Sequence, residues 1–175
     1  NLGPAESRII VFNKERKGEY WEELPLNHPA AQFLNNNWEV ELRHSREKWV
    51  KSTQMETLQD LKDTEHVRFT GTVVYKKRIQ IHKKGAILNL GKVSGVSELF
   101  VNGKSQGVKW YGNRIYKLGD DVKTGENEIE VHVITTMGNY MQALTDNPTA
   151  QKYTNRKGRE QEIQSMGLVG PVTVY

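Results

Sequence analysis

The chain has 175 residues and no cysteine, with 25 Lys and Arg against 21 Asp and Glu, which gives a formal net charge of +4. This length suits one domain that buries about 70% of its unfolded surface, and the lack of cysteine excludes disulfides and thiolate metal sites. Its apolar runs are far shorter than the ~18–20 residues of a membrane-spanning helix. Acidic residues interrupt the basic clusters, so we interpret these as solvated surface and expect no nucleic-acid partner.

The first 37 residues are the least regular part of the sequence. Arg8–Phe12 has the composition of a short strand, and Asn27-His28-Pro29 is typical of a helix start, because proline is tolerated in the first turn. We predict a short helix over Ala30–Leu34. We interpret residues 1–37 as a lead-in segment that packs on the following domain or belongs to a preceding one. The chain begins without Met and shows no signal peptide, so we expect an excised piece of a longer protein or a mature product.

Alternating apolar and polar residues predict the next strands. In Trp38–Leu42 the apolar residues alternate with charged ones, which predicts a strand with one wet face. Residues 43–57 have the composition of an exposed linker, and Thr57–Asp63 carries two leucines spaced for a brief helical turn. Alternation then holds over the thirteen residues of Phe69–Ile81, with Lys77 as the one misfit, and predicts a long strand.

Short strands separated by turns make up most of the remaining sequence. Asn102-Gly103 is a strong hairpin signal, because a type I′ turn needs positive φ at both central residues. A second turn is predicted at Lys123–Asn127. Regular spacing of short strands predicts an all-β fold, an antiparallel β-sandwich with short helical turns. Residues 138–166 form a long polar connection, which in a compact domain is usually a functional loop or an interface. The predicted strands are Ala86–Leu90, Val96–Val101, Ser105–Val108, Arg114–Lys117, Ile129–Thr135 and Val172–Tyr175.

The sequence shows no motif for catalysis or metal binding. Its carboxylates are predicted on wet strand faces or in turns, and nothing singles out the facing pair that a glycosidase needs. The five histidines, expected at surface or edge positions, lack metal-ligand spacing, and the serines lack a nucleophile elbow. Asp120, Asp121 and Asn127 offer oxygen atoms near a turn, but their spacing matches no calcium motif. We therefore expect no catalytic site and no cofactor, and leave calcium open.

The remaining signal is a set of loop aromatics beside planar polar side chains. Sugars are bound by exposed rings that stack on their C–H faces and by Asn and Arg groups that pair with vicinal hydroxyls. We predict that Trp110, Tyr111 and Tyr140 stack on a sugar, and that Arg114 and Asn139 hydrogen-bond to it. The alternative is that Trp110 and Tyr140 are buried in the core or against a neighbouring domain. The other tryptophans are interpreted as core or interface residues, namely Trp21, Trp38 and Trp49.

A set of segments from residue 38 onward forms a pattern typical of one family, namely Phe69–Tyr75, Leu88–Val93, Leu99–Gly103, Gly125–Val131 and Gly167–Val172. With them, the sequence resembles the galactose-binding-like domain of glycoside hydrolases, which implies an antiparallel β-sandwich of jelly-roll type. It is most similar to the accessory domains of family 2 glycosidases and to the C-terminal β-sandwich of large bacterial α-L-rhamnosidases.

This resemblance implies an accessory domain over residues 38–175 of a bacterial polysaccharide-degrading enzyme that acts on plant or host polysaccharides. The catalytic carboxylates would lie on a separate (β/α)₈ barrel, which needs ~250 residues of its own. The implied partners are a carbohydrate, which would be bound weakly, and the catalytic domain of the parent enzyme. The implied location of the protein is the periplasm or the outside of the cell. Two functions follow. One is a non-catalytic carbohydrate-binding or accessory domain, and the other is a purely structural interdomain sandwich without its own sugar site.

Overall fold

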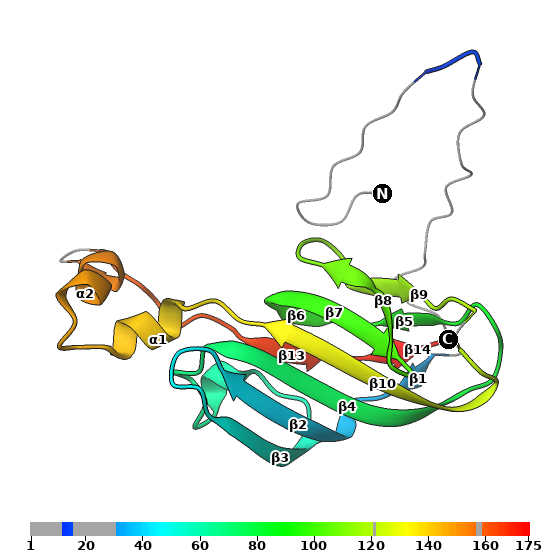
Figure 1. The fold of residues 1–175 in the computed structure, drawn as a ribbon, viewed down its shortest axis with the longest axis horizontal. Coiled ribbons are helices and arrows are strands. Elements are labelled where there is room, and N and C mark those ends of the chain that lie inside the picture. The colour runs from blue at the N-terminus through cyan, green and yellow to red at the C-terminus, as the bar shows by residue number, and fades with distance from the viewer. Residues whose placement is uncertain (1–11, 16–30, 121, 157–158) are drawn as a thin grey trace.

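The computed structural model describes residues 12–15, 31–120, 122–156 and 159–175 (Figure 1). The helix start expected at Asn27–Pro29 lies outside them, and so does the strand expected at Arg8–Phe12, apart from its last residue. The helix predicted over Ala30–Leu34 is wrong where the structure describes it. Gln32–Phe33 forms strand β1 because it pairs antiparallel with strand β14, Thr173–Val174.

One layer of the molecule is a sheet of six strands, in the order β3-β2-β4-β10-β7-β8. Every neighbouring pair in it is antiparallel, and β4 and β10 form the long central pair. The strand predicted at Phe69–Ile81 is confirmed as β4. The bounds are β2 Asn36–His44, β3 Val50–Thr57, β4 Gly71–Ile81, β7 Val96–Val101, β8 Lys104–Lys109 and β10 Gly125–Ile134.

Strand β3 corrects the expectation that residues 43–57 are linker. Its sequence is polar, and Met55 is its one buried residue. The sequence of β3 therefore lacks the alternation of apolar and polar residues that predicts a strand. The strand forms because its backbone pairs with the edge of β2 along most of its length. The helical turn predicted at Thr57–Asp63 is present at its end, as the 3₁₀-helix η1, Leu61–Asp63.

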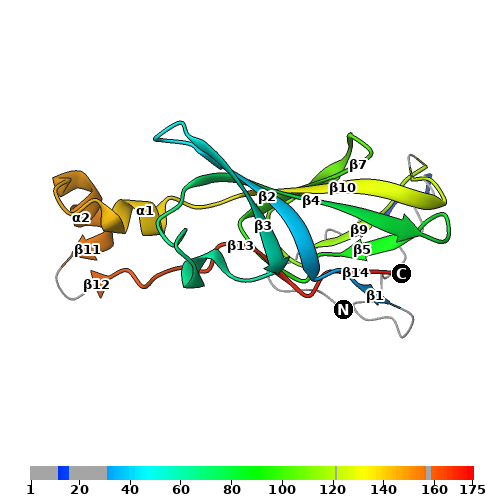
Figure 2. The same ribbon diagram turned by 90° about the horizontal axis from the view of Figure 1, so that it is seen from below.

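The second layer lies beneath the six-stranded sheet, as Figure 2 shows. Strands β1, β14, β5 and β9 form one part of it, and β6 and β13 form a two-stranded part that the sequence reasoning did not predict as strands. The all-β antiparallel sandwich with short helices is confirmed. The further bounds are β5 Ile87–Asn89, β6 Lys92–Ser94, β9 Ile115–Lys117 and β13 Gly167–Gly170.

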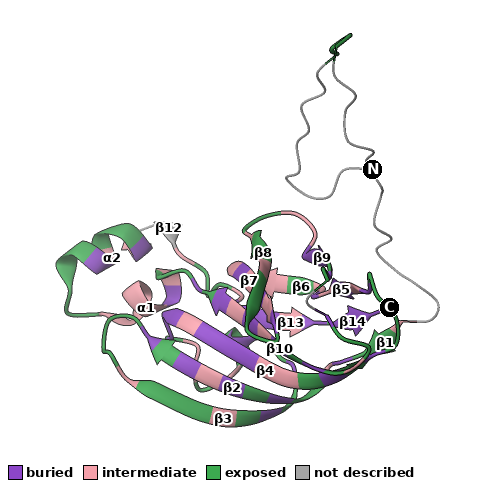
Figure 3. Ribbon diagram, turned by 45° about the vertical axis from the view of Figure 1, so that its right-hand side comes forward, coloured by how far each residue is buried: buried purple, intermediate pink, exposed green. Residues whose placement is uncertain are grey.

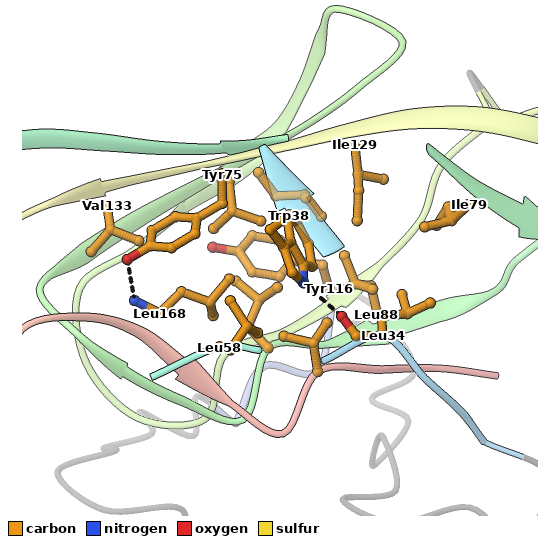
Figure 4. Packing of buried hydrophobic residues seen from close by; sticks show 14 of the residues in the cluster. Leu34, Trp38, Leu58, Tyr75, Ile79, Leu88, Tyr116, Ile129, Val133 and Leu168 are labelled. Atoms are coloured by element: carbon orange, nitrogen blue, oxygen red, sulfur yellow. Dashed lines mark hydrogen bonds between the residues drawn. The ribbon is translucent and has the colours of Figure 1, made fainter. Parts of the chain in front are cut away.

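Figure 3 marks the buried residues along the strands, and Figure 4 shows their side chains packed together as the core of the sandwich. Trp38 of β2 is fully buried, and its indole N–H donates to the Leu34 carbonyl at 2.6 Å. The Tyr75 ring meets it edge to face, with 6.4 Å between ring centroids, and the Tyr75 hydroxyl accepts a bond of 3.1 Å from the Leu168 N–H. The two layers are therefore joined by apolar burial and by satisfied polar groups. Other members of this core are Val40, Leu42, Val73, Leu88, Val131 and Val174.

Lys77 occupies an inward position of β4, and its contacts explain how the strand tolerates a charge there. Its ammonium donates to the carbonyls of Asn36, at 2.6 Å, and Asn37, at 3.3 Å. It also lies 5.8 Å from the centre of the Trp38 ring. Burial lowers the pKa of Lys77. The Lys77 side chain therefore reaches to the start of β2, where backbone carbonyls accept hydrogen bonds from its ammonium.

Two further features position the candidate site. Asn102 and Gly103 have φ of 51° and 79°, so the predicted two-residue hairpin between β7 and β8 is confirmed. Residues 138–166, which we call the arm, extend beyond one end of the sandwich (Figures 1 and 2). The arm contains α1 Gly138–Ala143, α2 Pro148–Thr154, β11 Asn155–Arg156 and β12 Arg159–Glu160.

No helix among the described residues has the length and apolar content needed to cross a lipid bilayer.

Candidate functional site

Residues 109–114, which we call the aromatic loop, connect β8 in one layer to β9 in the other. The Trp110 side chain is 69% exposed and that of Tyr111 is 37% exposed. Their ring centroids are 4.5 Å apart, with 63° between the ring planes. Trp110 therefore does not belong to the core of this chain, and its indole is available for stacking.

Arg114 is the last residue of the aromatic loop and is only 7% exposed. One terminal nitrogen donates to the Gly112 carbonyl at 3.0 Å, and the other donates to the Gly95 carbonyl at 3.2 Å. Its Nε is buried and has no hydrogen-bond partner among the described atoms. Burial lowers the pKa of this guanidinium. Arg114 thus fixes the loop through backbone carbonyls, whereas the sequence predicted a direct bond to a ligand.

The other half of the predicted site lies elsewhere. Asn139 of α1 is 1% exposed, and its amide exchanges two bonds of 2.8 Å with the backbone of Gln164. The Tyr140 ring packs on His44 of β2, with 5.2 Å between centroids. Strands β2 and β8 are four positions apart in the sheet, which at about 4.8 Å a strand is about 19 Å. The structure therefore brings Trp110 and Tyr111 together, and it does not bring Asn139 and Tyr140 to them.

Sequence reasoning missed the aromatic cluster in which Tyr140 takes part. His44 was expected at a surface or edge position, but it is only 5% exposed. Three rings pack on it, at 4.9 Å from Trp49, 5.6 Å from Phe69 and 5.2 Å from Tyr140. Its Nδ1 accepts from the backbone N–H groups of residues 46 and 47. This cluster fixes the base of the arm to the end of β2, and no local pattern could reveal it.

Asp60 is a second buried group that the sequence did not single out. It accepts bonds from the Met166 N–H at 2.8 Å, the Lys62 N–H at 3.0 Å and the Ser165 hydroxyl. Burial alone would raise the pKa of this carboxyl, but the three hydrogen bonds outweigh that effect and the pKa is lowered. Asp60 therefore joins η1 to the end of the arm as a carboxylate whose acceptor positions are occupied.

A shallow hollow of about 340 Å³ on the outer face of the six-stranded sheet contains two carboxylates, Glu39 and Glu41. Both belong to β2 and are two residues apart, so they project from one strand and do not flank a substrate from opposite walls. Lys76 and the polar side chains of β3 complete the lining. Among the described residues, no group of three or more His, Asp or Glu is placed to hold a metal ion.

No protein-family model matches the chain. A curated protein of Formosa agariphila, provisionally named a beta-glucuronidase, is 39% identical over 71 residues, which are 37% of this chain and 6% of that protein. The rhamnosidase from Novosphingobium sp. PP1Y matches with a TM-score of 0.65 and 19% identity, over 91% of this chain and 16% of its own.

Two further solved structures also match over most of the chain. A GH2 β-galacturonidase from Eisenbergiella tayi has a TM-score of 0.57 and 18% identity, over 82% of this chain and 23% of its own. A β-glucuronidase from Ruminococcus gnavus has a TM-score of 0.60 and 16% identity, over 89% of this chain and 31% of its own. The chain is thus similar in fold to one part of several larger glycoside hydrolases, and it spans less than a third of the length of each protein named here.

Proposed function

We propose that this chain is a non-catalytic accessory domain of a larger glycoside hydrolase, of the galactose-binding-like jelly-roll type, and that it binds carbohydrate through the aromatic loop. The similarity to parts of much longer glycoside hydrolases supports the first statement. The exposed Trp110 beside Tyr111 carries the second, because an exposed indole on a loop held by Arg114 is a preorganised stacking surface. The family resemblance supports a periplasmic or extracellular location and a polysaccharide substrate for the parent.

A Trp110→Ala substitution is expected to weaken the binding of oligosaccharides to the purified domain about 30-fold. Removing a central aromatic contact costs about 2 kcal/mol, which is roughly a 30-fold loss of affinity. Calorimetric titration and tryptophan fluorescence with rhamnose-, galactose- and uronate-containing oligosaccharides would measure it. Tyr153→Ala is the matched control, because Tyr153 is a 70% exposed aromatic on the arm and should leave binding unchanged. Absence of binding by the unaltered domain across that panel would contradict the proposal.

The alternative is a structural interdomain role, and the arm favours it. Its internal contacts are made largely by side-chain amides: Gln142 donates to the Gln161 carbonyl at 2.5 Å, and Gln151 donates to the Leu144 carbonyl at 2.8 Å. Apolar side chains remain on the outside, with Tyr153 70% and Ile163 47% exposed. An ordered projection that exposes apolar groups is typical of an interaction surface. The partner in this case is the catalytic domain of the parent.

If the arm is such a surface, the isolated domain is expected to self-associate at high micromolar concentration. Replacing both Tyr153 and Ile163 with Ser should restore a monomer, because the substitutions remove exposed apolar side chains. The arm should stay folded, because neither side chain takes part in the hydrogen bonds described above. Sedimentation velocity over a concentration series would measure this. Val108→Ser is the control, since Val108 is 57% exposed but belongs to β8 at the other side of the sheet. A strictly monomeric unaltered domain would count against this role for the arm.

A further inference from the structure

The aromatic loop begins and ends with a basic residue, Lys109 and Arg114, and contains no Asp or Glu. The segment 103–119, which contains β8, the loop and β9, has four basic residues and no Asp or Glu. Of the strands that pair with it, β5 has no acidic residue and β7 contributes Glu98, which accepts a 2.7 Å bond from the Ser105 hydroxyl. Lys104 and Lys117 have interaction partners of their own, so Lys109 and Arg114 are the charges considered at the loop. The basic residues are Lys104, Lys109, Arg114 and Lys117.

Arg114 is the most informative of these charges. Its guanidinium is buried and bonds only to the carbonyls of Gly112 and Gly95, and none of the described residues forms an ion pair with it. A buried charge without a counter-ion is costly, and its field is screened less than that of a surface charge. The structure tolerates this cost in the same loop as the exposed Trp110. That arrangement favours a negative group at the loop.

Lys109 precedes Trp110 in the chain and supplies a second charge in the aromatic loop. Its ammonium lies 5.4 Å from the centre of the Tyr116 ring. The Tyr116 hydroxyl is engaged with Ser97, at 2.9 Å from its hydroxyl and 3.1 Å from its carbonyl. Lys109 therefore has an aromatic neighbour and forms no ion pair with a described carboxylate. Its three N–H groups can serve a ligand.

We propose that the ligand of the aromatic loop is an acidic glycan, in which a sugar that stacks on Trp110 carries a carboxylate. This inference rests on the carbohydrate-binding function proposed above and adds the charge of the ligand to it. Lys109 binds the carboxylate, and Arg114 acts as a positioning residue that holds the loop and adds its field. A neutral sugar would use the ring surface and leave both charges without a counter-ion.

The test compares one uronate-containing oligosaccharide with its carboxyl-reduced form, in which each carboxylate is a hydroxymethyl group. At low salt, the unaltered domain should bind the acidic form about tenfold more tightly, and this preference should fall as salt rises. Lys109→Gln should remove most of the preference while binding of the reduced form persists. Lys83→Gln makes the same change of net charge in the turn after β4 and should keep the preference.

The outcomes separate this inference from the proposed function. Equal affinity for the two forms would overturn the acidic ligand and leave the carbohydrate site intact. A preference that survives Lys109→Gln but falls with Lys83→Gln would overturn the placement of the carboxylate at the loop. A sulfated neutral oligosaccharide that binds as well as the uronate form would overturn the choice of carboxylate. No binding of either form would contradict the carbohydrate-binding function itself.

Discussion

Trp38→Ala is expected to lower the free energy of unfolding by about 4 kcal/mol, the scale of a large aromatic deleted from a core. Trp38 is fully buried, and its loss would leave a cavity beside Tyr75 and an unpaired carbonyl at Leu34. That carbonyl lies at the junction where β1 leads into β2. The substitution therefore removes apolar contacts and a buried hydrogen bond at the same point. Urea denaturation followed by far-ultraviolet circular dichroism would measure it.

Two other substitutions make this result specific. Trp38→Phe keeps most of the packing and loses the bond to Leu34, so a loss of about 1–2 kcal/mol is expected. Trp110→Ala is the same chemical change at a 69% exposed residue, and it should alter stability by less than about 0.5 kcal/mol. Equal stability losses at Trp38 and Trp110 would contradict the burial of the one and the exposure of the other.

Asp60→Ala is expected to destabilise the domain by about 3 kcal/mol. The substitution leaves the N–H groups of Lys62 and Met166 and the Ser165 hydroxyl without their acceptor, and Met166 is itself buried. Buried donors without partners cost about 1–3 kcal/mol each, and partial solvation of this edge limits the sum. Because these bonds join η1 to the end of the arm, hydrogen exchange should accelerate first at the backbone amides of residues 61–64 and 166.

The same contacts predict a loss of stability in acid. The pKa of Asp60 is lowered from 3.8 in the folded protein, so the folded state favours the ionised carboxyl. Its contribution is complete above pH values near the unfolded pKa of 3.8, and it is lost as pH falls from there through the lower folded pKa. Asp60→Asn should flatten this part of the stability curve. Asp63→Asn, at an exposed residue of the same turn, is the control. If the free energy of unfolding of Asp60→Asn fell in acid as steeply as that of the unaltered protein, the ionised Asp60 would not be the source of this pH dependence.

Local sequence patterns determined the parts of this protein whose structure depends on near neighbours in the chain. The alternation in Phe69–Ile81 produced β4, and Asn102-Gly103 produced the hairpin, because pleat and turn geometry act over a few residues. Strand β3 has no such pattern. It forms because its backbone pairs with the edge of β2, and that edge is present only once the sheet has assembled.

The same division runs through the candidate site. Composition identified the aromatic residues and the planar polar groups that a sugar would use, and this selection was made before any distance was known. Only the tertiary structure decided that Trp110 is exposed and Trp38 buried, and that Asn139 and Tyr140 support the arm. These outcomes depend on partners far away in the sequence, such as His44 for Tyr140.

The sequence by itself thus determined an all-β sandwich and the residue types of its candidate site, since periodicity and turn chemistry are local. The tertiary structure decided which polar groups are buried and which rings face outward. Asp60 is the clearest case, because its partner Met166 is 106 residues away in the chain. Arg114 is another, since Gly95 lies on a different strand connection. Burial of a charge depends on the partners that folding brings to it, and a linear pattern does not contain them.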